Sequence, residues 1–152
     1  AVFIIDVYTK KIVGYEVSDH MRGTANLKAL KMALKDNKAP KIHHSDRGSQ
    51  YTYKSYTDLL KSLSTTISMA LSAQDNAYAE RINRTIKEEY LDHWKPETFN
   101  QLKKHVSKAV NNYNNKRSHN HLEKRNPEEF TSYWSTLTPE QRPLITIFDN
   151  EN

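Results

Sequence analysis

Two clusters of polar side chains are the parts of this sequence best suited to chemistry. The first surrounds Asp46, in the run His43-His44-Ser45-Asp46-Arg47-Gly48-Ser49-Gln50-Tyr51. Asp46 follows a short run of strand length, and sites in open α/β sheets form at the carboxyl ends of strands. Gly48 beside the carboxylate leaves room for a metal ion. Asp-x-Gly is also ordinary turn chemistry, so this cluster alone leaves both interpretations open.

The second cluster lies on a predicted helix over residues 75–91. Asn76, Glu80, Asn83 and Lys87 recur at spacings of four, three and four, so they share one face of that helix. The adjacent face is apolar and is expected to pack on a sheet. A carboxylate at the boundary of these faces would be held close to the core. The alternative is an amphipathic surface helix whose Glu and Lys face solvent.

Taken together, the two clusters indicate a metal-dependent reaction at phosphorus. Mg²⁺ prefers oxygen ligands and is often held by one or two carboxylates together with phosphate oxygens. Two such ions can activate a nucleophile and stabilise the leaving oxygen in phosphoryl transfer. We therefore expect Asp46, from a strand end, and Glu80, from a helix, to bind Mg²⁺ or Mn²⁺ jointly.

The elements that must position these residues alternate between strands and helices. This order predicts an α/β domain with helices packed on a mixed sheet. The expected strands are 1–6, 11–17, 41–44 and 65–69, and the expected helices start near 24, 56, 75, 98 and 127. Thr24 or Asn26 could cap the first helix, and Pro127 suits the first position of a last helical turn.

The sequence resembles the insertion-sequence transposases that share the retroviral-integrase catalytic core. Four stretches carry the resemblance, which extends from residue 1 to 130, and 33 residues separate Asp46 from Glu80, close to the usual interval of that family. The stretches are AVFIIDVYTKKIVGYEVS, HHSDRGSQYTYKSY, SMALSAQDNAYAERINRTIKEEYL and YNNKRSHNHLEKRNPEEF. The resemblance implies a ribonuclease-H-like fold, with a catalytic core over 1–130 and a C-terminal tail over 131–152.

The resemblance also implies roles for individual residues. Asp46 and Glu80 match the second and third catalytic acids of an Asp-Asp-Glu site, and Lys87 matches a basic residue associated with DNA contact. Asn76, Asn83 and Arg47 are expected as further DNA-contacting neighbours. The implied activity is 3′-end cleavage followed by strand transfer, with Mg²⁺ or Mn²⁺ as cofactor. The implied partners are transposon-end DNA, target DNA and further copies of the chain.

The match departs from the family at its first catalytic aspartate, which lies on the first, central strand. We expect that strand to be missing upstream of Ala1, because Asp6 matches a non-catalytic aspartate of the second strand instead. The 152-residue chain is therefore expected to be inactive alone. Restoring the strand should give activity that Asp46→Asn or Glu80→Gln abolishes. Without it, two strand edges lose their hydrogen-bond partner.

The composition is compatible with a DNA-binding protein but does not by itself indicate one. The net charge is +5 and there is no cysteine, which suits a nucleic-acid partner and an intracellular home. The longest apolar run is too short to span a membrane, so we expect a protein of the bacterial cytoplasm, associated with the nucleoid. The histidine pairs lack the partners of a zinc site. Two other functions stay open: a non-catalytic DNA-binding fragment and a ribonuclease-H-like nuclease that hydrolyses without strand transfer.

Overall fold

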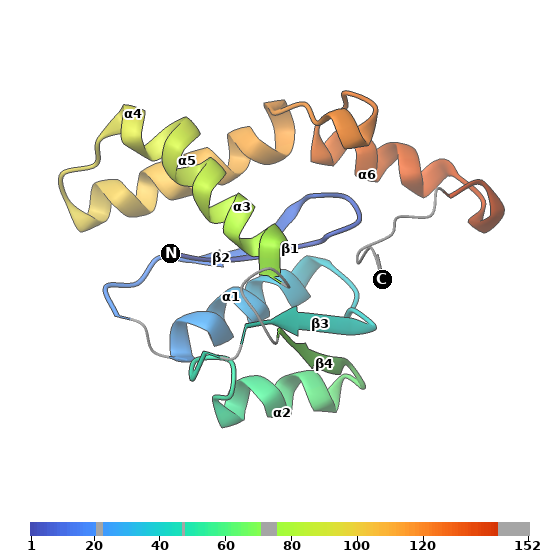
Figure 1. Cartoon of the computed structure of the whole chain (residues 1–152), viewed down its shortest axis with the longest axis horizontal. Coiled ribbons are helices and arrows are strands. Elements are labelled where there is room, and N and C mark those ends of the chain that lie inside the picture. Colours follow the sequence, from blue (N-terminus) through green and yellow to red (C-terminus); the bar gives the residue numbers. More distant parts are fainter. Residues whose placement is uncertain (21–22, 47, 71–75, 143–152) are drawn as a thin grey trace, which may run out of the picture.

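A computed structural model describes residues 1–20, 23–46, 48–70 and 76–142 of the chain. Strands and helices alternate through the first half, and the second half is helical (Figure 1). The strands are β1 (Val2–Ile5), β2 (Ile12–Glu16), β3 (Ile42–Ser45) and β4 (Thr66–Met69). The longer helices are α1 (Gly23–Asp36), α2 (Lys54–Ser62), α3 (Ala77–Ile86), α5 (Phe99–Lys116) and α6 (Pro127–Thr136). The expected alternating α/β order is confirmed.

The β1–β2 pair is the hairpin that the sequence predicts. The strands are antiparallel, with Phe3 opposite Tyr15 and an irregularity in register between Ile4 and Ile5. Asp6 organises the turn that follows β1. Its carboxylate accepts hydrogen bonds from the Tyr8 N–H at 2.9 Å and the Thr9 hydroxyl at 3.0 Å. Asp6 therefore has a structural task, which agrees with its expected non-catalytic role.

The β3–β4 pair is parallel, as a helical crossover through α2 requires. His44 lies opposite Ser68, and its Nδ1 lies 2.9 Å from the Ser68 hydroxyl. Within the described residues, β1 pairs with β2 alone and β3 pairs with β4 alone. Among the described residues, the strands thus form two separate two-stranded sheets.

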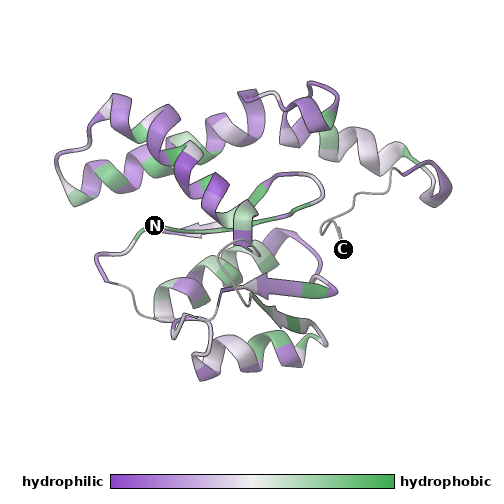
Figure 2. Cartoon of the chain, viewed as in Figure 1, coloured by the Kyte–Doolittle hydropathy of each residue, from purple (hydrophilic) through white to green (hydrophobic). Residues whose placement is uncertain are grey.

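Two apolar clusters hold the layers together. One joins β2, α3 and α5 through Ile12, Ile82, Val106 and their neighbours, and the other joins α1 and α2 through Leu30, Tyr56 and Leu60. Figure 2 shows apolar and polar residues alternating along α5, which is the pattern of a helix buried on one side.

Helix α1 crosses β2 at Gly14. A Cβ placed on Gly14 would lie 2.2 Å from the Ala29 carbonyl oxygen, so glycine is needed for this close approach. Thr24 and Asn26, which we expected as candidate caps, both lie inside α1, and Asn26 is buried. The capping prediction is wrong because the helix starts earlier than its first large apolar residue.

The long helix predicted over 75–91 is interrupted near its end. Helix α3 passes directly into a π-helical segment, η2 (Lys87–Leu91), and then into the short α4 (Asp92–Trp94). A π-turn holds one more residue than an α-turn and often marks a functional position. Here it begins at Lys87.

Helix α6 extends beyond the single helical turn that the sequence suggested. Asn126 caps it in a reciprocal arrangement with Glu129, and Pro127 occupies its first turn. The helix continues to Thr136, past residue 130, where we expected the tail to begin. Trp134 near its end lies 5.8 Å from the Tyr8 ring, between ring centroids, so this part of the expected tail packs on the β1–β2 turn.

Candidate functional site

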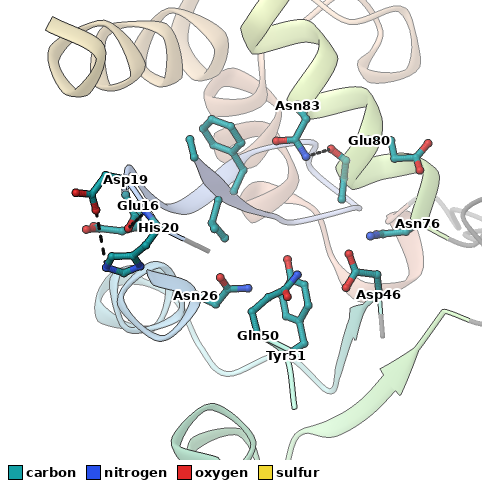
Figure 3. A pocket seen from close by; sticks show the side chains of 15 residues that line it. Glu16, Asp19, His20, Asn26, Asp46, Gln50, Tyr51, Asn76, Glu80 and Asn83 are labelled. Atoms are coloured by element: carbon teal, nitrogen blue, oxygen red, sulfur yellow. Dashed lines mark hydrogen bonds and ion pairs between the residues drawn. The ribbon is translucent and has the colours of Figure 1, made fainter. Parts of the chain in front are cut away.

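Asp46 and Glu80 line the same pocket, which we call the front pocket. It has a volume of about 520 Å³ and is bordered by the β1–β2 hairpin, the start of α1, the loop after β3 and the first turns of α3. Figure 3 shows Asp46 and Asn76 on one side of this pocket, with Glu16 and Asp19 at the opposite end. The fold therefore brings the two predicted acids to one side of the molecule.

The position of Asp46 follows from the end of β3. Strand β3 ends at Ser45. Immediately after it, Asp46 Oδ1 accepts a hydrogen bond from the Gly48 N–H at 2.7 Å. The Gly48 carbonyl then accepts one from the Tyr51 N–H at 2.9 Å. Burial, followed by the nearby Asp46 carboxylate, raises the pKa of Tyr51. The turn and the carboxylate at the strand end, which we treated as alternatives, are thus compatible.

Glu80 lies in the first turn of α3, where the positive end of the helix dipole favours a carboxylate. Its side chain is exposed, and in Figure 3 it points away from Asp46, whereas Asp46 points into the pocket. An exposed glutamate can change rotamer without disturbing the core. Joint binding of one ion by these two groups therefore requires the Glu80 side chain to turn inward.

The other predicted site residues divide into three groups. Asn76 and Asn83 also line the front pocket, although the Asn83 amide donates to the Ala79 carbonyl of its own helix at 3.0 Å. Lys87 is exposed at the end of α3 and lies outside the lining of the pocket. Arg47 lies outside the described residues.

Several further lining residues were not among the predicted site residues, including Glu16, Asp19, Gln50, Tyr51 and Asn26. Gln50 and Tyr51 belong to the Asp46 cluster, and a tight turn after Asp46 would have indicated them. Asn26 comes from α1, far away in sequence, and no local pattern distinguishes it from a surface residue of that helix.

The charges of the front pocket favour a cation. Its described lining side chains include Glu16, Asp19, Asp46 and Glu80 but no lysine or arginine. Carboxylate and amide oxygens are suitable ligands for Mg²⁺. The described residues contain no group of three His, Cys, Asp or Glu side chains close enough to hold a metal ion. The donor chemistry therefore fits a hard cation, while these residues supply only part of a full ligand set.

Two models described as integrase core domain match the chain, one over residues 1–73 and the other over residues 62–127. Together these two matches extend over residues 1–127, so the sequence is similar to the integrase core family along most of its length. It is 32% identical over 134 residues to the transposase for insertion sequence element IS904 from Lactococcus lactis, covering 85% of this chain and 53% of that protein. It is 35% identical over 135 residues to an uncharacterized 31 kDa protein of insertion element IS600 from Shigella sonnei, covering 84% and 48%. The chain spans about half the length of these two curated relatives.

A solved structure supports the fold of the integrase core. The HTLV-2 integrase catalytic core domain, in complex with magnesium in a trimeric form, matches with a TM-score of 0.63 and 16% sequence identity. The match covers 83% of this chain and 80% of that one. At this identity the likeness concerns the fold, and it confirms the ribonuclease-H-like class expected from the sequence. In the part of the chain that the structure describes, no helix is both long and apolar enough to cross a membrane.

Proposed function

We propose that this chain forms part of the catalytic domain of a DNA transposase, which cleaves 3′ ends and transfers strands with the help of Mg²⁺ or Mn²⁺. The observation that carries the proposal is the shared pocket of Asp46 and Glu80. Both acids that match the family pattern line this one pocket, which supports the proposal. In the intact protein the substrates would be transposon ends and target DNA, bound by several copies of the chain in the bacterial cytoplasm.

The charge of the front pocket makes a cation necessary for this reaction. Carboxylates repel the phosphate of a DNA strand, so a phosphate could approach Asp46 and Glu80 only with a metal ion between them. Asp46 and Glu80 would hold that ion, and Asn76 would offer an amide oxygen beside Asp46. A bound divalent ion would activate the attacking hydroxyl and stabilise the charge on the leaving oxygen.

The fold would also orient the two carboxylates toward the bound ion. The hydrogen bond from the Gly48 N–H fixes the Asp46 carboxylate at the strand end, so this ligand needs little reorganisation. Glu80 must turn inward, and its exposed position allows this. The described residues hold no cluster of three candidate ligands, so Asp46 and Glu80 would supply part of the ligand set of the ion.

Paramagnetic Mn²⁺ provides the direct test of metal binding. Adding Mn²⁺ to the isotope-labelled chain should broaden the NMR signals of Gly48 and Asn76 first. Asp46→Asn should weaken this effect, as should Glu80→Gln. Asp19→Asn is the matched control, because Asp19 lines the opposite end of the same pocket. Broadening that is centred elsewhere, or that survives both site substitutions unchanged, would overturn the proposed site.

An oligonucleotide assay separates the proposed function from its two alternatives. In the full-length transposase, joined product supports strand transfer, and nicked product without joining supports a nuclease. Salt-sensitive binding without any cleavage supports a DNA-binding fragment. Since even outer partners of metal ligands are each worth about 10- to 100-fold, Asp46→Asn or Glu80→Gln should lower joining by about a hundredfold or more.

A further inference from the structure

The two faces of α3 border pockets of opposite charge. The front pocket receives Asn76, Glu80 and Asn83 from this helix. A second pocket of about 560 Å³, which we call the rear pocket, receives Tyr78, Arg81, Ile82 and Thr85 from it. The remaining walls come from the end of β1, the β1–β2 turn, Tyr113 of α5 and the segment after α5.

The described lining of the rear pocket contains basic side chains and no carboxylate. Its described lining includes Lys10, Arg81, Arg117, His119 and His121, and it includes no Asp or Glu. The lining also includes three residues with neutral hydrogen-bond donors, Thr85, Ser118 and Asn120. Hydroxyl, amide and guanidinium groups around a concave surface are the donors that bind phosphate oxygens.

The nearby acids leave part of this charge uncompensated. Glu89 lies outside the pocket lining and pairs with Arg117 through two hydrogen bonds, of 2.7 Å to Nε and 2.6 Å to Nη2. Asp6 acts on Lys10 at longer range. Arg81 is exposed and forms no ion pair with a described residue. The lining thus keeps a net positive charge.

Two side chains of the pocket respond to these positive charges in addition to their burial. Burial, followed by the Arg117 charge, lowers the pKa of His119 to about 4; Glu89 opposes this shift, and Lys10 adds a smaller lowering effect. Burial, followed by the Arg81 charge, lowers the pKa of Lys10. A bound anion would relieve the repulsion between these cations.

The frame of the rear pocket is well fixed. Lys10 Nζ donates to the Val7 carbonyl at 2.7 Å and lies 4.2 Å from the centre of the Tyr78 ring. The His119 N–H donates to the Arg125 carbonyl at 3.0 Å, and the His119 carbonyl accepts from two N–H groups of the following turn. His119 also packs edge-on against Tyr113. These contacts hold the donors in place before any ligand arrives.

We propose that the rear pocket binds a phosphate group of a DNA strand, while the front pocket carries out the chemistry on the other side of α3. This rests on the proposed DNA-joining function, because that function supplies the DNA. A strand that is gripped behind α3 would be positioned through the helix that carries Glu80. Contacts of this kind set register and orientation and do not read sequence.

Arg81 and Arg84 offer a matched comparison. Both are exposed arginines of α3, but Arg81 lines the rear pocket and Arg84 does not. With EDTA present to remove divalent ions, we expect Arg81→Gln to weaken binding of an oligonucleotide several-fold and to lower the salt slope by about one. Arg84→Gln should have a clearly smaller effect, and Thr85→Val gives a second variant inside the pocket.

Inorganic phosphate tests the pocket without DNA. Titration of the labelled chain with phosphate in EDTA should shift the signals of Thr85 and His119 and raise the pKa of His119, measured by NMR. Arg81→Gln should abolish these changes. Equal effects of the two arginine substitutions, or the absence of phosphate shifts at Thr85 and His119, would overturn the proposal. So would shifts caused only by a glutamate-rich peptide, which would indicate a protein partner. These readouts need neither metal nor catalysis, so they can fail or succeed independently of strand joining.

Discussion

The side chain of Asn114 hydrogen-bonds both backbone groups of Ile12. Its Oδ1 accepts from the Ile12 N–H at 2.9 Å, and its Nδ2 donates to the Ile12 carbonyl at 2.9 Å. The two residues are 102 positions apart. Asn114 thus extends the hydrogen bonding of β2 with a side chain from α5, in a buried place where water could not replace it. This pair ties the helical second half of the chain to the hairpin that borders the front pocket.

Replacing Asn114 by Leu should destabilise the fold strongly. The substitution leaves two buried backbone groups of Ile12 without partners, at about 1–3 kcal/mol each. We expect the free energy of unfolding, measured by urea denaturation, to fall by about 3 kcal/mol. Asn115→Ala is the control, because the exposed side chain of Asn115 donates only to the Asn111 carbonyl of its own helix. Similar losses for both variants would contradict a special role of the Asn114 contact.

Replacing Gly14 by Ala should disrupt the packing of α1 on β2. The added Cβ would lie 2.2 Å from the Ala29 carbonyl oxygen and 2.9 Å from the Ala33 Cβ, so the helix must move. Overpacking of this kind costs about 1–3 kcal/mol or more, which a thermal melt would detect. Gly48→Ala is the matched control, because its Cβ would meet only the Gln50 side chain, which can move aside. The prediction fails if both alanine variants melt at the same temperature.

The buried pair of His43 and Tyr56 should make stability depend on pH. The Tyr56 hydroxyl lies 2.7 Å from His43 Nε2, and burial, followed by the His44 charge, lowers the pKa of His43 from 6.5 to about 4. Above pH 6.5 the ring is neutral in both the folded and unfolded states. As the pH falls towards 4, the unfolded chain binds a proton that the folded chain refuses, so stability decreases.

The size of this effect is on the order of 3 kcal/mol between the two pKa values. Denaturation of the native chain and of His43→Gln at pH 7 and pH 4.5 would measure it, since glutamine can still accept from Tyr56 but does not titrate. Both proteins retain His119, whose contribution therefore cancels in the difference. Equal acid sensitivity of the two chains would show that His43 is not responsible.

Lys87 should contribute to DNA affinity by charge alone. It is exposed and lies outside the front pocket lining, so a role in holding the metal is not expected. Lys87→Ala should weaken oligonucleotide binding to a similar degree for all sequences and lower the salt slope by about one. Binding measured across a series of salt concentrations tests this, with Lys31→Ala on the exposed side of α1 as control. A change in sequence preference would point to base contact instead.

The sequence predicted most elements because their patterns are local. The short run of strand length before Asp46 and the β-branched run of β4 need no knowledge of the rest of the chain. Pro127 at the start of α6 likewise identifies a helix start. The acids were paired by their match to a family pattern, and the fold places both on one pocket.

What could not be predicted depends on contacts between distant segments. Asn26 resembles an ordinary helix residue until α1 is packed, and only then does it face the front pocket. The rear pocket draws Lys10, Arg81 and His119 from three separate segments. The length of α6 depends on its contact with the β1–β2 turn, where Phe130 and Trp134 meet Tyr8.

The π-helical segment after α3 holds one residue more than a regular helix of the same length. Removing one residue from 87–91 would therefore restore a regular helix and leave the residues beyond it facing nearly the same way. Glu80 would keep its place, because it lies before the segment, and Trp94 would keep its contacts with His105 and Lys108. One codon deleted here would therefore preserve both the packing of the helical second half and the two predicted metal ligands.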